Sequence, residues 1–238
     1  MKKRAPRSIR SIIDHQVHRW SSQQQQREEA AEVEAEHWPI ITVSREFGSL
    51  GARIGNIAAD LLGFTFWDQE LVTTIAEQTG AQEALLATLD ESARSRVEEF
   101  VDGLVFGTGG AATDYVRQVA KVVKTLDRQG GAVVVGRGSQ FIIEPERALR
   151  LRVVCPREER IEGYAQREGL SRREAERSVD AIEKDRQTFI NQHYRRSLSE
   201  PSNYDLLLNS ATLPEQQAAK VVIEAYRAKF GRVPPSFA

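Results

Sequence analysis

Arginines follow the apolar runs of this sequence at the points where strands would end. Arg45 ends the run "ITVSR", Arg137 follows "AVVVG", and Arg157 follows "ALRLRVVCP". Guanidinium groups bind phosphate and carboxylate oxygens through paired hydrogen bonds, so arginines gathered in one place favour a polyanionic ligand. The carboxyl ends of parallel strands meet at one edge of a sheet, where the ligands of α/β proteins bind. The sequence therefore predicts an anion-binding site along that edge.

A glycine-rich segment, "VSREFGSLGARIG" from Val43 to Gly55, lies between the first apolar run and a helical pattern. A turn in that position can direct backbone N–H groups at phosphate oxygens, and the N-terminus of the next helix adds a partial positive charge. The segment lacks the G-x-x-x-x-G-K-[ST] pattern of the usual phosphate loop. Taken alone, it leaves two interpretations open: a phosphate-binding loop and a plain turn between strand and helix.

The elements that would position these residues alternate along the chain. Short apolar runs predict strands at residues 40–44, 64–67, 132–138, 148–155 and 204–210. Helical patterns lie between and after them, at about residues 51–62, 69–100, 113–129, 157–169, 171–194 and 214–230. Strands that alternate with helices indicate an α/β domain with a mostly parallel sheet covered on both faces.

The helix expected over residues 171–194 carries one continuous stripe. Ala175, Val179, Ile182, Arg186 and Phe189 follow one another at spacings of 4, 3, 4 and 3 residues, which places them on one face. Arg186 therefore lies among apolar side chains. A charge in that position must reach water along its own stem, pair with an acid or face a ligand.

Composition excludes several classes of protein. The chain has 238 residues, a net charge of -1 and one cysteine, Cys155, so it has no internal disulfide, no cysteine-cluster zinc site and no strong nucleic-acid signal. No apolar run reaches the roughly 18 residues of a transmembrane helix, and the N-terminus lacks the apolar region of a secretory signal. We expect a cytoplasmic protein.

The two ends differ from the domain between them. Residues 1–38 join a basic start to the polar, acidic stretch "SSQQQQREEAAEVEAEH", which favours a flexible, Gln-rich extension. A docking helix that contacts lipid, RNA or a partner protein stays open, because Ile9, Ile12, Ile13, Val17 and Trp20 share roughly one helical face. Residues 232–238 are expected to form a C-terminal tail.

Four segments in order resemble the cytidylate kinase-like family, and together they span about residues 39–225. They are "ITVSREFGSLGARIGNIAADLLGFTFWDQELV", "VVVGRGSQFII", "EKDRQTFINQHY" and "EPSNYDLLLNSATL". The resemblance implies a three-layer P-loop kinase fold over residues 39–231. That fold has a parallel, mostly five-stranded sheet, a helical monophosphate-binding insert at about 69–129 and a lid at about 157–196. The implied reaction moves the γ-phosphoryl group of ATP, with Mg²⁺, to CMP or a related acceptor.

The resemblance also implies roles for single residues. The catalytic arginines would be Arg45, Arg137 and Arg186. The donor phosphates would be held by Gly48, Ser49, Gly51, Arg53, Gly55 and Arg160. The acceptor would be held by Asp68, Arg137 and Lys184. Metal-ligating side chains are not among the expected site residues. Other interpretations stay open: Asp68 could cap the next helix, Arg53 and Arg160 could be surface charges, and Arg186 could form a structural ion pair.

This chain departs from the family pattern at four positions. Leu50 replaces a glycine, Ala52 stands where an arginine is usual, and Val135 and Gly138 replace acidic residues. These changes motivate an alternative function, a nucleotide-binding sensor or scaffold protein with weakened catalysis. A third hypothesis is a kinase for a different small phosphate acceptor, whose pocket the long insert would shape.

Overall fold

The computed structural model describes residues 37–103 and 113–235. The predicted N-terminal extension, with its possible docking helix, lies outside these ranges except for His37 and Trp38. Trp38 is buried and packs in the core, with the guanidinium of Arg232 4.6 Å from its ring centroid. The packed domain therefore includes at least one residue that the sequence assigned to the extension.

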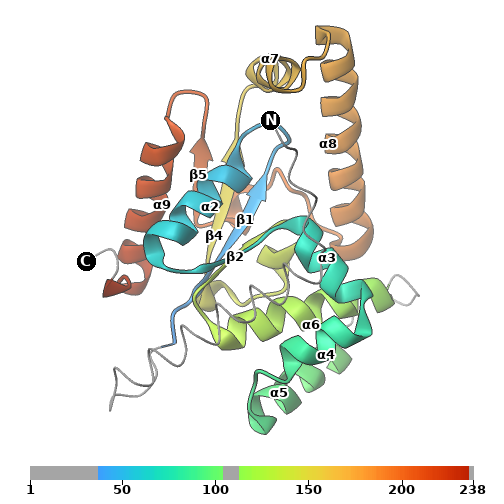
Figure 1. The fold of residues 1–238 in the computed structure, drawn as a ribbon, viewed down its shortest axis with the longest axis vertical. Coiled ribbons are helices and arrows are strands. Elements are labelled where there is room, and N and C mark those ends of the chain that lie inside the picture. The colour runs from blue at the N-terminus through green and yellow to red at the C-terminus, as the bar shows by residue number, and fades with distance from the viewer. Residues whose placement is uncertain (1–36, 104–112, 236–238) are drawn as a thin grey trace, which may run out of the picture.

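One sheet of five parallel strands forms the centre of the molecule, in the order β2-β3-β1-β4-β5 (Figure 1). The strands are β1 (Ile40–Arg45), β2 (Thr65–Trp67), β3 (Ala132–Val135), β4 (Ala148–Val154) and β5 (Leu206–Asn209). β1 and β3 are buried along almost their whole length, which is typical of parallel strands covered on both faces. The predicted α/β class and five-stranded parallel sheet are confirmed.

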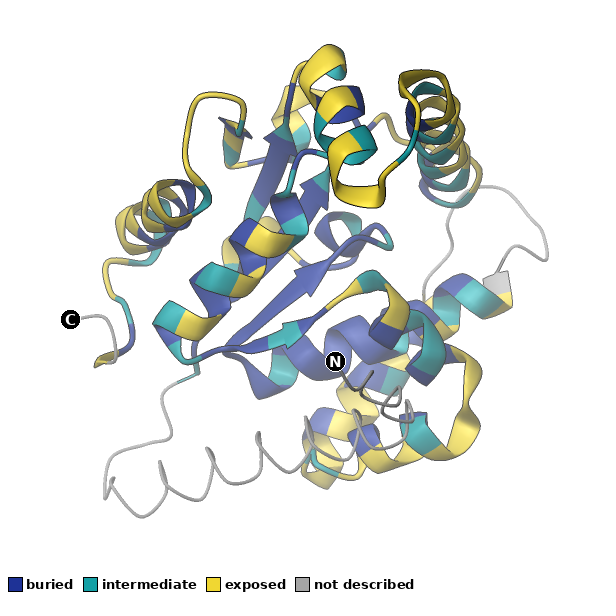
Figure 2. Ribbon diagram, turned by 45° about the horizontal axis from the view of Figure 1, so that its top comes forward, coloured by how far each residue is buried: buried dark blue, intermediate teal, exposed yellow. Residues whose placement is uncertain are grey.

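Two apolar clusters on the two faces of the sheet make up the layers (Figure 2). On one face, β1, β3 and β4 pack against α2 (Gly51–Leu62) and α9 (Glu215–Phe230). On the other face, the sheet packs against α6 (Thr113–Gln129) and the helices of the insert. The result is a three-layer arrangement with the sheet in the middle.

The segment between β2 and β3 is helical, as the sequence predicts. It contains α3 (Gln69–Glu77), α4 (Thr79–Leu86) and α5 (Glu91–Gly103), which pack with α6. Asp68 accepts a hydrogen bond from the Leu71 N–H at 2.8 Å and so caps α3 directly after β2. This cap fixes the direction in which the chain leaves the sheet edge.

Two helices stand beyond the carboxyl ends of the strands, α7 (Arg157–Glu168) and α8 (Arg172–Tyr194) (Figure 1). Ser171 and Glu174 form the capping box that their spacing predicts. Ala175 and Val179 pack on Ile161 of α7, so the first half of the predicted stripe joins the two helices. Short turns of 3₁₀ helix occur at Ser139–Phe141, Pro145–Arg147 and Pro201–Asn203.

Within residues 37–103 and 113–235, none of the helices combines the length and the apolar character needed to cross a lipid bilayer.

Candidate functional site

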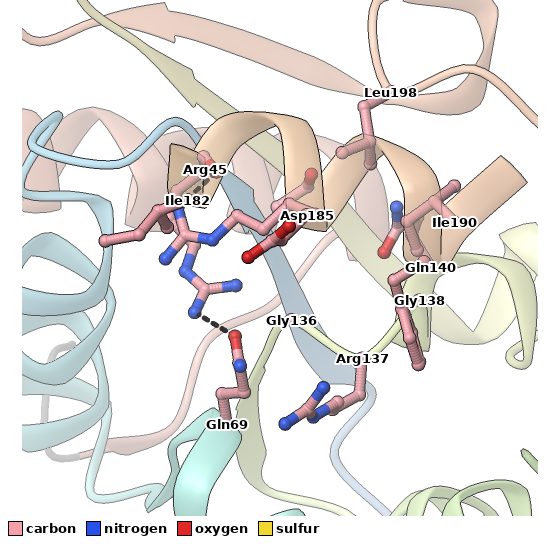
Figure 3. A pocket seen from close by; sticks show the side chains of 13 residues that line it. Arg45, Gln69, Gly136, Arg137, Gly138, Gln140, Ile182, Asp185, Ile190 and Leu198 are labelled. Atoms are coloured by element: carbon pink, nitrogen blue, oxygen red, sulfur yellow. Dashed lines mark hydrogen bonds between the residues drawn. The ribbon is translucent and has the colours of Figure 1, made fainter. Parts of the chain in front are cut away.

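A pocket of about 380 Å³ opens at the carboxyl edge of the sheet, between the ends of β1 and β3, the start of α3 and the helix α8 (Figure 3). Its lining residues are Ser44, Arg45, Gln69, Gly136, Arg137, Gly138, Gln140, Ile182, Asp185, Arg186, Phe189, Ile190 and Leu198. A second hollow shares Arg45, Gln69, Arg137 and Arg186 with it. The three arginines predicted to act together therefore line one cavity.

Arg45 is the last residue of β1, and its guanidinium lies in the pocket. Nη2 donates a hydrogen bond of 2.8 Å to Oε1 of Gln69 on α3. Gly136, which lies against this guanidinium, has a φ of +80°, a left-handed conformation that favours glycine. Burial and the nearby charges of Arg186 and Arg137 lower the pKa of Arg45 to about 9. A cation held in such surroundings favours an anionic ligand.

Arg137 follows β3 in a left-handed backbone conformation, with φ of 53°. Positive φ is uncommon outside glycine, and such strained residues cluster at functional sites. Its Nε donates to Thr73 Oγ1 at 2.7 Å, and the phenol of Tyr194 donates to its carbonyl oxygen at 2.7 Å. The guanidinium lies 5.4 Å from the ring centroid of Phe189. These contacts hold the guanidinium at the pocket wall.

Arg186 comes from α8 and lies on the stripe that the sequence predicts. The second half of that stripe, Ile182, Arg186 and Phe189, lines the pocket. Nη1 of Arg186 lies 3.3 Å from Oε1 of Glu183 and donates to the carbonyl oxygen of Arg45 at 3.4 Å. Burial lowers the pKa of Arg186. Of the two interpretations left open, the ion pair is present, and the same guanidinium also faces the cavity.

The lining carries more positive than negative charge. Arg45, Arg137 and Arg186 contribute cations, whereas Asp185 contributes the carboxylate among the lining residues. The other end of the cavity is apolar, with Ile190 and Leu198 beside the amide of Gln140 (Figure 3). The arrangement suits a ligand with an anionic end and an uncharged end.

The glycine loop between β1 and α2 packs tightly against its neighbours. A Cβ at Gly51 would lie 2.7 Å from Cβ of Arg45 and 2.9 Å from Cβ of Val153, and one at Gly48 would lie 3.0 Å from Cβ of Arg160. Leu50 adopts a left-handed conformation with φ of 60° immediately before α2. An ordinary side chain thus stands in a conformation that glycine adopts without strain.

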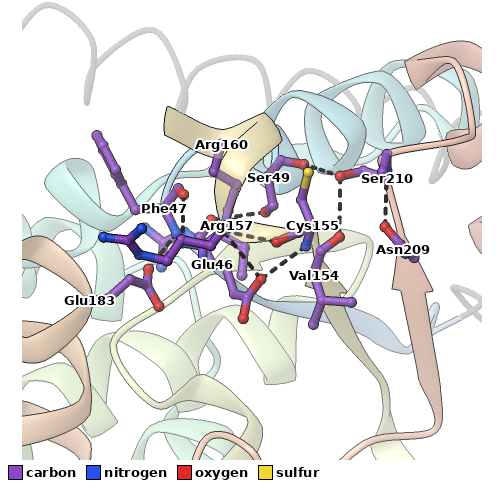
Figure 4. Close-up of polar contacts among 12 residues, drawn as sticks. Glu46, Phe47, Ser49, Val154, Cys155, Arg157, Arg160, Glu183, Asn209 and Ser210 are labelled. Carbon is purple, nitrogen blue, oxygen red and sulfur yellow. Dashed lines mark hydrogen bonds and ion pairs between the residues drawn. The ribbon is translucent and has the colours of Figure 1, made fainter. Parts of the chain in front are cut away.

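Arg160, on α7, holds the loop through hydrogen bonds (Figure 4). The buried side chain donates from Nε to the Cys155 carbonyl oxygen at 2.8 Å and from Nη1 to the Phe47 carbonyl oxygen at 3.2 Å. Nε also lies 3.5 Å from Oε2 of Glu46, and Ser210 Oγ donates to the Ser49 carbonyl oxygen at 2.7 Å. The guanidinium of Arg160 therefore orders the loop rather than lining the pocket.

A carboxylate lies against one amide of the loop. Oε1 of Glu183, on α8, accepts a hydrogen bond from the N–H of Phe47 (Figure 4). The same oxygen is the one that pairs with Arg186. The loop amide and the guanidinium of Arg186 thus share one anionic oxygen.

Other residues that the resemblance singled out lie outside the pocket lining. Arg53 is 64% exposed and pairs with Glu215 of α9 at 3.0 Å. Asp68 caps α3, and its neighbour Gln69 reaches the pocket instead. Lys184 is exposed on α8, and Gly55 packs α2 against the sheet.

Sequence reasoning missed several residues at or near the site, among them Gln69, Gln140, Asp185 and Arg152. Asp185 and Gln69 are sequence neighbours of Arg186 and Asp68, and only the three-dimensional packing tells which neighbour faces the cavity. Arg152 lies within the run "LRLRVV", which the sequence predicts as a buried strand. A charged residue inside such a run is itself a signal.

A model of the cytidylate kinase-like family matches residues 40–212. The chain belongs to the cytidylate kinase-like family. The resemblance drawn from the four sequence segments is thereby confirmed. The match spans every strand and the lid helices, so the three-layer domain is a P-loop kinase-like fold.

Solved structures and curated proteins add less to the family assignment. An uncharacterized protein from Eubacterium ventriosum has a similar fold, with a TM-score of 0.62 and 17% identity over 80% of this chain and 98% of that one. The protein TT1252 from Thermus thermophilus, also 17% identical, covers 82% of this chain and 99% of its own, but its TM-score of 0.42 supports no argument.

A uronate isomerase from Corynebacterium glutamicum is 25% identical over 101 residues, which is 42% of this chain. The chain spans about a fifth of the length of this curated relative, 20%.

Proposed function

We propose that this protein transfers the terminal phosphoryl group of ATP to a nucleoside monophosphate such as CMP, or to a related small acceptor. The observation that carries the proposal is the convergence of Arg45, Arg137 and Arg186 on one pocket beside the glycine loop. Phosphoryl transfer needs in-line positioning and neutralisation of charge on the phosphate oxygens. Three guanidinium groups can supply that neutralisation, and membership of a kinase-like family supports the same reaction.

The loop is suited to the phosphates of ATP. The first-turn amides of α2 have no acceptor inside the helix, and the helix dipole favours an anion at this end. Gly48 and Gly51 let the backbone approach its neighbours closely, and the Phe47 amide already binds a carboxylate oxygen. We assign the donor phosphates to the backbone of Gly48 and Gly51; Ser49 is buried, and its N–H donates to the Glu46 carbonyl oxygen at 3.3 Å. The exposed Arg53 takes no part in this assignment.

Asp185 is suited to hold Mg²⁺ together with the phosphates. Proteins that bind Mg²⁺ with a nucleotide often supply one or two carboxylates, and water and phosphate oxygens complete the shell. Asp185 is exposed and lines the pocket next to Arg186. When bound, the ion would neutralise charge on the phosphate oxygens.

The acceptor phosphate would lie between Arg137 and Arg45, whose guanidinium groups flank the same cavity. Thr73 and Gln69 orient these two arginines through hydrogen bonds of 2.7 and 2.8 Å. The uncharged part of the acceptor would then occupy the apolar end beside Ile190 and Leu198. Arg186, on the lid helix, would neutralise the transferring group, while α8 excludes water from it.

A turnover assay tests the proposal. The protein is incubated with Mg-ATP and each nucleoside monophosphate in turn, and ADP formation is followed. We expect turnover with at least one acceptor, and we expect Arg186→Ala to lower kcat roughly 10²- to 10³-fold, as for loss of one transition-state donor. Arg177→Ala is the matched control, because Arg177 is exposed on the same helix and does not line the pocket.

Tight nucleotide binding without turnover for any acceptor would rule out the transferase. An equal loss of activity in Arg186→Ala and Arg177→Ala would rule out the role of Arg186, because it would indicate a general effect on α8.

A second function, nucleotide binding without transfer in a sensor or scaffold protein, is favoured by the surroundings of Arg137. The family resemblance expects acidic residues at positions 135 and 138. Val135 is buried in the cluster under α2 and α9, and a side chain at Gly138 would collide with the ring of Tyr194. Carboxylates are therefore absent from both positions. Under this function, nucleotides bind to the pocket and ADP does not form.

A further inference from the structure

Arg152 is a buried cation in the middle of the protein. It lies on β4, is 6% exposed, and donates one hydrogen bond of 2.8 Å, from Nη1 to the Ser44 hydroxyl. Among residues 37–103 and 113–235, no carboxylate lies within 4.0 Å of its guanidinium. A guanidinium has five N–H donors, so most of its hydrogen-bonding capacity is not used by the described protein.

The other buried cations in the described residues have acidic partners. Lys124 pairs with Glu144 at 2.6 Å, and Arg160 lies 3.5 Å from Glu46. Arg150, two residues before Arg152 on the same strand, pairs with Asp205 at 2.8 Å. The fold thus supplies acids to the other two buried cations, Lys124 and Arg160, and also to the partly exposed Arg150, whereas Arg152 has none.

A buried charge without a counter-ion is strongly unfavourable, so natural proteins pair such groups or use them to bind ions. The neutral neighbours of Arg152 do not provide the missing charge. Ser44 Oγ accepts from Arg152, and its other contact is the phenol of Tyr204 at 3.4 Å. Tyr204 donates its proton to the Leu198 carbonyl oxygen at 2.9 Å. These contacts therefore supply no negative charge to Arg152.

The pocket reaches the hydrogen-bond partner of Arg152, although Arg152 is not itself one of the lining residues. Ser44 lines the pocket, and Ser44 and Arg152 are direct partners in the register of β1 and β4, so both side chains lie on the same face of the sheet. The charge of Arg152 also acts on Arg45 and Arg186, where it adds to the lowering of both pKa values. Arg152 therefore stands behind the same wall that carries the three lining arginines.

We propose that Arg152 and Ser44 form an additional oxyanion subsite on the inner wall of the pocket, and that the ligand places a phosphoryl group there. This inference rests on the proposed phosphoryl transfer. β1 separates β3 from β4, so the strands that bring Arg137 and Arg152 run about 10 Å apart. The bound ligands that contact both arginines, taken together, therefore carry at least two phosphoryl groups. The one at Arg152 belongs to the phosphate chain of the donor or to the acceptor.

Anion-dependent thermal stability tests the subsite with inorganic pyrophosphate at pH 7.5. Pyrophosphate raises the Tm of the wild-type protein, and Arg152→Met binds it roughly tenfold to hundredfold more weakly, as expected for loss of a charge-assisted hydrogen bond. The Tm of Arg152→Met without pyrophosphate equals or exceeds that of the wild type, because an unpaired buried cation has been removed. Arg150→Met is the matched control: its Tm falls, and it keeps the response to pyrophosphate.

An undiminished response to pyrophosphate in Arg152→Met overturns the proposal, as does a wild-type protein that gives no response. If Arg152→Met does not fold, Arg152→Lys replaces it, because it keeps the charge but loses the forked geometry; an undiminished response in this variant also overturns the proposal. Titrations with ATP and with CMP then identify the source of the phosphoryl group. The nucleotide that the Arg152 variant binds more weakly than the wild type does is the one that occupies the subsite. If the variant binds both ATP and CMP as tightly as the wild type, the proposal is overturned.

The outcome is independent of turnover. If the protein binds pyrophosphate through Arg152 but forms no ADP, the subsite is supported and the proposed phosphoryl transfer is ruled out. If the protein forms ADP but responds equally to pyrophosphate with and without Arg152, phosphoryl transfer is supported and the subsite is ruled out.

Discussion

Arg45 lies at the centre of the arginine group, and its electrostatic state should be measurable. Burial and the neighbouring arginines lower its pKa to about 9, whereas a free arginine has a value of 12.5. At pH 7 the group is charged, and in the free protein it loses its proton as the pH rises through about 9. A bound anion stabilises the charged form and therefore raises the pKa.

We expect binding of the acceptor nucleoside monophosphate at pH 9 to be accompanied by proton uptake, because its phosphate returns a proton to Arg45 in those molecules that have lost it. At pH 7 Arg45 is already protonated and contributes no uptake. Calorimetric titrations in two buffers of different ionisation enthalpy measure the number of protons. Absence of uptake at pH 9 would contradict the assignment of the acceptor phosphate to the surroundings of Arg45.

Arg160 and Arg53 should differ sharply in their effect on stability. Arg160→Met removes the hydrogen bonds to the Cys155 and Phe47 carbonyl oxygens, and we expect it to lower the free energy of unfolding by about 2–3 kcal/mol. Arg53→Ala removes an exposed ion pair with Glu215, and we expect a change within about 0.5 kcal/mol. Urea denaturation measures both. Equal effects would contradict the role of Arg160 in holding the loop.

For single residues, the sequence predicts a role at the site where the residue ends an apolar run or belongs to a periodic stripe. Arg45 and Arg137 end predicted strands, and Arg186 lies on a periodic apolar stripe, so all three could be expected to face a ligand. The partners of Arg53 and Arg160 come from distant parts of the chain, α9 and the glycine loop, and local pattern carries no information about them.

The lid helix α8 and the glycine loop are coupled through Glu183. Its carboxylate accepts from the Phe47 N–H and pairs with Arg186, so it holds the lid against the loop with a negative charge. Donor phosphates assigned to the loop would compete with this carboxylate for the same donors. Under the proposed function, the contact of Glu183 with the loop would therefore oppose nucleotide binding.

Glu183→Gln should tighten ATP binding about threefold or more, because the competing acceptor becomes neutral and binds the amide less strongly. Isothermal titration calorimetry measures the Kd. Glu176→Gln is the control, since Glu176 lies on the same helix but pairs with Arg157, away from the pocket. Weaker ATP binding in Glu183→Gln alone would instead indicate that Glu183 supports the nucleotide site, for example by orienting Arg186.

At the scale of elements, strands and helices were predictable, and their contacts were not. The apolar runs located all five strands of the sheet, and the Ser171 and Glu174 pair located the start of α8. The stripe on α8 was also recognisable. The sequence does not show that the first half of the stripe packs on α7 while the second half lines the pocket. That division depends on where α8 lies relative to the sheet.

In the whole molecule, the sheet, insert and lid meet at one edge, and the pocket lies where they meet. The insert contributes Gln69, the sheet contributes Arg45 and Arg137, and the lid contributes Arg186. The alternation of strands and helices predicts both the fold class and the edge at which we propose that the ligand binds. The order of the strands was not predictable from that alternation, and the order is what brings Arg152 of β4 next to Ser44 of β1.

The measurement that tests the central claim most directly is the fate of the terminal phosphoryl group of ATP. The protein is incubated with Mg²⁺, ATP labelled at the γ-phosphate and a panel of nucleoside monophosphates, and the labelled products are separated. Transfer predicts a labelled nucleoside diphosphate with one acceptor, and loss of that product in Arg186→Ala. Label found only as inorganic phosphate, or retained in ATP with every acceptor, would contradict the account.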